Sequence, residues 1–171
     1  MGLIQVATST VTSGVANVDL VGITSDDVYM IVVSDVRVAS DNDVRVRITK
    51  SSDSSADTTS NYDNARLTLR SDTTFGKSAD TNADYWNIFE FLGNDVSEAG
   101  NMIIYCYNFN SSSEFSFVTM ENVAVDNANP TLKGKQGGAV HTVAQSNNGL
   151  RWYHASGANI TSGTFTLYKV V

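Results

Sequence analysis

The chain has 171 residues and a formal net charge of −7, with eleven Lys and Arg against eighteen Asp and Glu. This length suits one domain with its own core, and the scattered basic residues argue against a nucleic-acid-binding surface. The longest apolar runs cover a few residues, far short of the roughly 18 that a membrane-spanning helix requires. The first residues also lack the pattern of a signal peptide.

The composition favours strands over helices. Ser, Thr and Asn make up nearly a third of the chain, and their side chains compete with the backbone hydrogen bonds of a helix. The single cysteine, Cys106, lies in an apolar run, so we expect a buried thiol and no intrachain disulfide. Many short apolar segments separated by polar turns predict an all-β protein. We expect an antiparallel, jelly-roll-like β-sandwich in which residues 1–171 form a single domain with little or no helix.

In the first part of the chain, strands are expected within residues 2–12 and 15–23 and between residues 28 and 49. Residues 28–39 begin with apolar side chains on both parities, which is typical of a central strand covered on both faces. A turn-like Asp-Asn-Asp follows, so residues 28–39 and 44–49 are predicted to form a hairpin. The second of these segments alternates, with Val44, Val46 and Ile48 predicted inward and Arg45, Arg47 and Thr49 outward.

The middle of the chain combines polar loops with short strands. Residues 50–61 and 72–82 are rich in Ser, Asp, Thr and Asn and are predicted loops, whereas residues 65–70 alternate like a strand. Residues 84–93 fit one face of a helix nearly as well as a strand. Their aromatic and β-branched side chains favour the strand.

The second half of the chain predicts a hairpin of residues 101–108 and 114–125, with the first strand interior because both of its parities are apolar. The glycine-rich stretch 134–138, with its lysines, predicts a turn with solvated charges rather than a phosphate-binding loop. Residues 139–145 are a candidate strand, and residues 148–171 read as two closing strands. Because an exposed apolar edge invites uncontrolled pairing, we expect the last strand to be buried in the sheet or against a partner.

No catalytic, cofactor-binding or metal-binding residue is assigned from the sequence. His141 and His154 lie in strand-like segments, and no serine has the surroundings of an activated nucleophile. One Cys and two His do not have the spacing of a zinc site. We therefore expect a protein that is not an enzyme and has no cofactor.

The polar loop at residues 51–63 could supply oxygen ligands to a calcium ion from Asp53, Asp57, Asn61 and Asp63. It lacks the regular spacing and the final Glu of a calcium-binding loop. A solvated loop is the favoured interpretation, and whether this segment binds an ion or a partner is left open.

The aromatic residues allow two interpretations. Exposed rings on a sandwich could form a platform against sugar rings, whereas rings of this size more often fill the core or an interface. The core is the favoured interpretation. The candidate contacts with a glycan or another partner are Tyr62, Trp86, Trp152 and Tyr153.

Three segments carry a resemblance to a known group of proteins. They are GNMIIY at residues 100–105, NGLRW at 148–152 and ITSGTFTLY at 160–168. In this order they resemble the small jelly-roll-like β-sandwich structural proteins of tailed-bacteriophage virions. Lys169 departs from the pattern, because a Gly commonly follows the tyrosine there.

The resemblance implies a non-enzymatic virion structural protein, with an accessory capsid decoration (cement-type) or head/tail-surface subunit as the first expectation. The alternative is a tail fibre, an adaptor or a receptor-binding, carbohydrate-binding module. The implied partners are other virion proteins and, as a candidate, a host-surface glycan, with no nucleic acid and no membrane. Open sheet edges favour a homo-oligomer, with a trimer preferred. The expected location is the surface of the phage particle, after assembly in the cytoplasm of the bacterial host.

Overall fold

The computed structural model describes residues 2–126 and 131–171, which form two antiparallel sheets with no helix among them. The all-β prediction is therefore confirmed. In the part of the chain that the structure describes, no helix could cross a membrane. The strands are β1 Leu3–Val11, β2 Asn17–Val21, β3 Tyr29–Val38, β4 Asn42–Lys50, β5 Tyr62–Arg70, β6 Phe75–Ala83, β7 Trp86–Leu92, β8 Gly100–Tyr107, β9 Ser116–Val125, β10 Leu132–His141, β11 Asn147–His154 and β12 Ile160–Val170.

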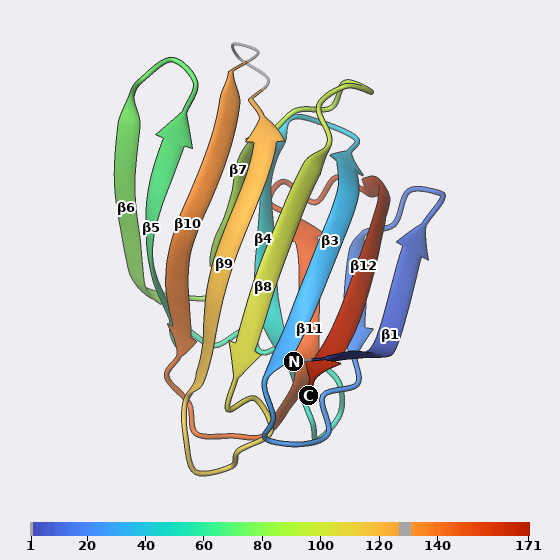
Figure 1. Ribbon diagram of the computed structural model, residues 1–171, viewed down its shortest axis with the longest axis vertical. Helices are drawn as coiled ribbons and strands as arrows, with labels where there is room; N and C mark the ends of the chain where they lie inside the picture. The colour runs from blue at the N-terminus through green and yellow to red at the C-terminus, as the bar shows by residue number, and fades with distance from the viewer. Residues whose placement is uncertain (1, 127–130) are drawn as a thin grey trace.

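The two sheets contain a jelly roll. The larger sheet has the order β1-β12-β3-β8-β9-β10-β5-β6 and the smaller sheet the order β2-β11-β4-β7. Without β5, β6, β9 and β10, eight strands remain in two four-stranded sheets, β1-β12-β3-β8 and β2-β11-β4-β7. Each connection in chain order except that from β4 to β7, which pair with each other, then crosses between the sheets, as in a double-sheet jelly roll. Figure 1 looks onto the larger sheet with the smaller sheet behind it.

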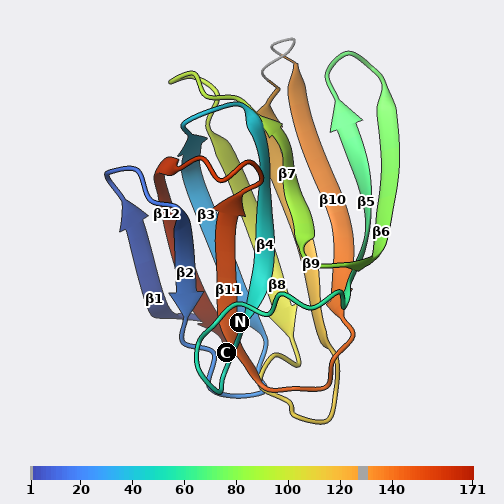
Figure 2. The ribbon, with the colours of Figure 1, turned by 180° about the vertical axis from the view of Figure 1, so that it is seen from behind.

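The other four strands lengthen the larger sheet on one side. The hairpin β5–β6 is inserted between β4 and β7, and the hairpin β9–β10 between β8 and β11. They pair in the order β9-β10-β5-β6, which we call the extension. Seen from behind, the smaller sheet leaves β5 and β6 outside its edge (Figure 2). Of the smaller sheet, β7 is the strand that lies against β9, β10 and β5.

The hydrophobic core lies between the two sheets of the jelly roll. Val44, Val46 and Ile48 of β4 are buried there, as their alternation predicted. Thr49 was predicted to face outward, and this was wrong. It is buried because the loop after β4 folds back over it through a bridge between Thr49 and Ala56.

The predicted hairpin of residues 28–39 and 44–49 was wrong. β3 belongs to the larger sheet and β4 to the smaller one, so the short connection between them crosses the sandwich. Both strands have strongly apolar inner faces, and packing these faces against each other buries more apolar surface than pairing them edge to edge.

Two predicted irregular segments are strands. Residues 72–82, predicted as a loop, mostly belong to β6, and the glycine-rich stretch 134–138 lies inside β10. β10 pairs without interruption with both β9 and β5. Pairing on both sides therefore overrides the low strand propensity of glycine.

The hairpin in the second half is confirmed, because β8 and β9 pair antiparallel. Residues 84–93 contain a strand, as favoured, and the last two strands are β11 and β12. β12 lies between β1 and β3, so it is buried within its sheet. β3 and β8 are central in the sheet, but they are not covered on both faces: Ile103 of β8 is 43% exposed on the outer side.

Candidate functional site

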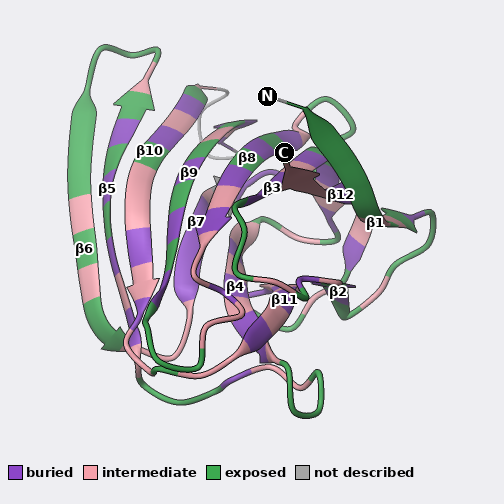
Figure 3. Ribbon diagram, turned by 60° about the horizontal axis from the view of Figure 1, so that its bottom comes forward, coloured by how far each residue is buried: buried purple, intermediate pink, exposed green. Residues whose placement is uncertain are grey.

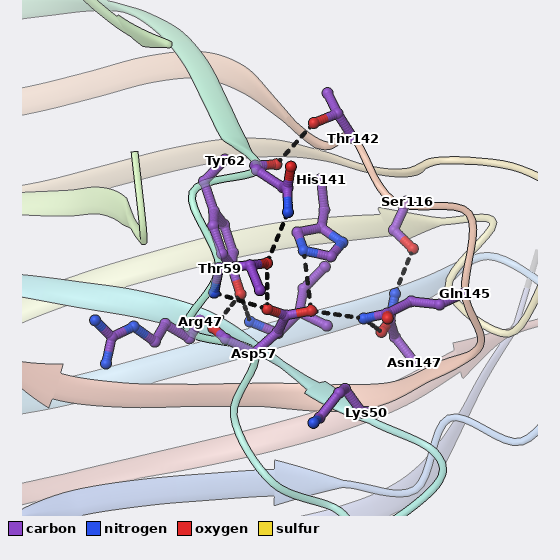
Figure 4. Close-up of polar contacts among 12 residues, drawn as sticks. Arg47, Lys50, Asp57, Thr59, Tyr62, Ser116, His141, Thr142, Gln145 and Asn147 are labelled. Carbon is purple, nitrogen blue, oxygen red and sulfur yellow. Dashed lines mark hydrogen bonds and ion pairs between the residues drawn. The ribbon is translucent and has the colours of Figure 1, made fainter. Parts of the chain in front are cut away.

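A buried polar network at one end of the sandwich contains the acid and base that a hydrolase would need (Figure 4). Its centre is Asp57, in the loop after β4. One carboxylate oxygen accepts hydrogen bonds from the backbone N–H and the hydroxyl of Thr59 at 2.9 and 2.5 Å, and the other accepts one from Gln145 Nε2 at 2.9 Å. Tyr62 donates its hydroxyl to the Asp57 carbonyl at 2.7 Å. These bonds fasten the loop to β5 and to the segment before β11.

His141 lies beside Asp57, with Nε2 at 3.5 Å from Oδ2 and the ring 4.7 Å from that of Tyr62. Burial lowers the pKa of His141, against the opposing effect of the Asp57 carboxylate. Burial by itself raises the pKa of Asp57, but the hydrogen bonds from Thr59 and Gln145 outweigh it and hold this pKa below its usual value. The arrangement is thus a neutral imidazole beside a carboxylate.

The network has no access for a substrate. His141 and the nearby Ser116 have no exposed surface, and the Ser116 hydroxyl accepts a hydrogen bond from Asn147 Nδ2 at 2.9 Å. His154 is also buried, with Nε2 at 2.8 Å from the Ser40 carbonyl and Nδ1 at 3.0 Å from the Ser156 hydroxyl. His154 therefore serves local hydrogen bonding and packing. His141, whose ring nitrogens have no hydrogen-bond partner among the described residues, contributes packing and its electrostatic contact with Asp57.

The acidic residues of the 51–63 loop do not converge. Asp53 accepts the backbone N–H of Ser55 at 2.9 Å, and Asp63 accepts that of Asn82 at 2.7 Å. Asn61 donates to the Thr59 hydroxyl at 2.7 Å, so it is also engaged within the loop. Within residues 2–126 and 131–171, no group of three or more His, Cys, Asp or Glu could hold a metal ion.

The structure places most of the candidate aromatic residues in the core. Tyr62, Trp86 and Trp152 have no exposed surface. Trp86 meets Tyr62 edge-on at 5.4 Å, and Trp152 lies 5.2 Å from the ring of Phe165. Tyr153 is half-buried, with the Arg47 guanidinium 4.7 Å from its ring centroid. Three of the four rings therefore do not reach the surface where a sugar would stack.

The inner face of the extension is charged. Lys133 and Lys135, predicted to be solvated, are both buried there. Lys133 pairs with Asp126, and Lys135 Nζ lies 3.3 Å from Glu90 of β7. Burial lowers the pKa of Lys135 to about 8, although Glu90 opposes this shift. The prediction of solvated lysines was wrong because β10 directs these side chains toward β7.

Arg66 of β5 completes this charged layer. Its guanidinium is buried, 2.8 Å from an oxygen of Asp80 on β6 and 3.7 Å from one of Glu90. Ion pairs out of water lose hydration and gain little net stability, but a charge left without its partner there is costly. The layer between β7 and the extension thus combines charge matching with apolar packing such as the contact of Trp86 with Tyr62.

The outer face of the extension is apolar. Successive side chains of a strand point to opposite faces, so the positions between the buried charges of β5 and β10 point outward. Phe75 of β6 is 75% exposed and Leu67 of β5 is 54% exposed. The set that we call the outer apolar face consists of Leu67, Leu69, Phe75, Ile103, Phe117, Val123 and Leu132. Figure 3 shows how much of β6 and β5 is exposed compared with the strands of the core.

Two hollows lie beside β10 on this face. Gly134 and Gly138 occupy outward positions of β10, so no side chain rises above the sheet at these two positions. One hollow, of ≈ 690 Å³, lies between β10 and the β5–β6 hairpin and is lined by Leu67, Lys77 and Ala79 among others. A second, of ≈ 520 Å³, includes Phe117, Gly138 and Val140. The outer apolar face therefore has both ridges and hollows.

The sequence analysis did not identify this face. Residues 65–70 alternate visibly, but alternation alone does not tell which parity is covered by another layer. The lysines and glycines of β10 would have been informative only with the knowledge that β10 lies between β9 and β5.

The chain matches no protein-family model, and no curated protein is significantly similar to it.

Proposed function

We propose that this protein is a non-enzymatic structural subunit of a bacteriophage particle that acts through protein–protein contacts. An accessory capsid decoration subunit or a head- or tail-surface subunit is the form we favour. The observation that carries the proposal is the outer apolar face, because a monomer rarely leaves a large continuous apolar surface in water, and such surfaces mark interaction sites.

The strand order supports this class. Double-sheet jelly rolls occur in viral capsid and lectin domains, although a fold alone does not assign a function. The three segments that resemble phage virion proteins lie on β8, β11 and β12. These strands belong to the jelly roll and not to the extension, so the resemblance concerns the scaffold, and the face supplies the contact.

A second exposed apolar group lies at the opposite edge of the larger sheet. Leu3, Ile4 and Val6 of β1 are exposed, and β1 is an edge strand. Exposed edges of this kind are normally covered by a partner or blocked by charge. This edge is a natural contact for another virion protein, and it is separate from the outer apolar face.

The alternative of a tail fibre, an adaptor or a glycan-binding module predicts a different location and an exposed aromatic platform. The buried positions of Tyr62, Trp86 and Trp152 do not favour a glycan platform. A glycan array with the purified protein tests this alternative directly, and specific binding that is lost in Tyr153→Ala would support it.

Electron microscopy of purified particles, labelled with an antibody against this chain, tests the proposal. Label over the head in many copies is expected for a decoration subunit, whereas label confined to the tail would indicate the adaptor alternative. Free protein in the lysate that is absent from the particles would refute both.

A pair of variants tests whether the outer apolar face is needed for incorporation into particles. Leu69→Asp places a charge on the outer apolar face, and Asn17→Asp places one at an exposed position of β2 on the smaller sheet, away from this face and from the β1 edge. We expect Leu69→Asp to reduce incorporation into particles at least tenfold and Asn17→Asp to leave it unchanged.

A further inference from the structure

We propose that the outer apolar face binds a second copy of the same face, about a two-fold axis that runs parallel to the strands between β10 and β5. The inference deepens the proposed function and rests on it only in treating this face as a contact surface. Three observations carry it: the size of the face, the positions of its charges, and the positions of its ridges and hollows.

The size of the face suits a stable dimer. Its seven apolar residues are 38–75% exposed and are spread over five adjacent strands, β8, β9, β10, β5 and β6. A standard interface covers roughly 800 Å² of each partner, a surface on the scale of one sheet face. A small ligand would cover only part of this surface, whereas a second sheet would cover all of it.

Two opposite charges on this face lie in one row across the sheet. The strand register aligns Glu121 of β9 with Gln136 of β10, Gln136 with Leu67 of β5, and Leu67 with Lys77 of β6. All four side chains are exposed. Gln136 Nε2 donates to Glu121 at 2.7 Å and holds this carboxylate over the face. The row therefore has a negative end and a positive end, with its centre between β10 and β5.

This row selects one axis. Sheets that pack face to face as an isologous pair are related by a two-fold axis in the plane of the contact. An axis parallel to the strands, through the centre of the row, places Lys77 of each copy opposite Glu121 of the other. An axis along the row would place Glu121 opposite its own equivalent, and like charges in contact are unfavourable.

The neighbouring row is complementary about the same axis. It consists of Val123, Gly134, Leu69 and Phe75, aligned across β9, β10, β5 and β6. The axis sets Phe75 of one copy against Val123 of the other and Leu69 against Gly134, which has no side chain. Each large side chain thus meets a glycine or another apolar side chain. A partner of a different sequence is not expected to be complementary in charge and shape to both rows about the same axis.

The row on the other side has small side chains. It aligns Thr119, Gly138, Ala65 and Ala79, so the two sheets can approach closely there. Stacked sheets normally lie about 10 Å apart with their strands within about 30° of each other. The long side chains of Lys77 and Glu121 can span the remaining distance at the ends of the row.

Sedimentation equilibrium of the purified full-length chain tests the contact. We expect twice the chain mass of 18.4 kDa at micromolar concentration. Glu121→Lys and Lys77→Glu should each weaken the dimer at least tenfold, and the double charge swap should restore it. Asn17→Asp, on the smaller sheet, is the matched control, and circular dichroism of each variant confirms that it is folded. A monomer at all concentrations, or an oligomer that neither single variant changes, would overturn the proposal.

A cysteine pair tests the axis itself. Across the proposed contact, positions 77 and 121 of the two copies face each other about 10 Å apart, which is too far for a disulfide but within reach of a short bismaleimide cross-linker. Lys77→Cys with Glu121→Cys should therefore form cross-linked dimers with this reagent, whereas neither single variant should, because the axis shifts equal positions of the two copies by three strand spacings, about 14 Å. Cys106 is buried and does not interfere. Cross-linking by Glu121→Cys alone would support the other axis and contradict the proposed one.

The two proposals fail separately. Dimers in solution without label on particles would refute the virion function and keep the dimer contact. Labelled particles, together with a purified protein that is monomeric and does not cross-link, would support the virion function and refute the dimer contact.

Discussion

The jelly roll and the extension share one sheet but differ in the composition of their inner faces. Between β1 and β8 the inner face is apolar, with Ile31 and Phe165 fully buried, while the outer face includes Thr8 and Ser34. In the extension, the inner face combines buried apolar residues such as Met120 with the buried charges of Arg66 and Lys135, and further large apolar side chains lie outside. The amount of buried charge on the inner face therefore changes within one sheet.

The cause of this difference is the second layer. The smaller sheet covers the jelly roll with apolar side chains, so an apolar face opposite it is favoured. Over the extension this layer is reduced to β7 and its neighbouring loops, with Glu90 among the facing residues. Apolar side chains on that side would stay partly exposed to water, so the extension buries charges there and has large apolar side chains on its outer side.

The largest expected effect contrasts an aromatic side chain of the core with one of the outer apolar face. Trp152→Ala should lower the free energy of unfolding by about 4 kcal/mol, because it opens a cavity beside Phe165. Phe75→Ala should change it by less than about 0.5 kcal/mol when the protein is dilute enough to be monomeric. Urea unfolding measures both. Similar losses in the two variants would mean that the extension is not open to water in the monomer.

A second contrast concerns neighbouring glycines of β10. A Cβ at position 137 would lie 2.4 Å from the Ala65 carbonyl oxygen, whereas a Cβ at position 138 would be 3.6 Å from the Val118 carbonyl oxygen. Gly137→Ala should therefore cost about 2–3 kcal/mol in unfolding free energy, and Gly138→Ala close to nothing. Equal effects would mean that β10 does not approach β5 as closely as its register requires.

The charged inner layer predicts a dependence of stability on pH. The pKa of Lys135 is about 8 in the folded protein and near 10.4 when unfolded. Between these values the unfolded chain binds a proton that the folded chain does not, so this group's contribution to stability rises with pH. From pH 7.5 to 9.5, the wild type should gain about 2 kcal/mol relative to Lys135→Met. Urea unfolding of both proteins at the two pH values measures this, and a constant difference would contradict it.

The smallest expected effect belongs to His141. Its pKa is lowered by burial, so below pH 6.5 the unfolded chain takes up a proton that the folded chain resists, and stability falls. Between pH 7 and 5 the wild type should lose stability relative to His141→Gln. Thermal unfolding at the two pH values measures this difference. A gain relative to His141→Gln on acidification would show that His141 is instead stabilised in its charged form by Asp57.

Local patterns predicted part of the fold well. The alternation of Val44, Val46 and Ile48 identified an inner face correctly, and the low helix propensity of the composition predicted the all-β class. Cys106 was expected to be buried, and it is. These features depend on residues close together in the chain, where a period of two and an apolar face are readable directly.

The sequence alone determined that the chain forms strands and which parity of several strands is apolar. The tertiary structure decided which parity is covered. It made β10 a strand despite its glycines, joined β5 to β10, and turned Leu67 and Leu69 outward above the buried Arg66. The physical reason is that coverage depends on a second layer, and the strands of that layer are distant in the sequence.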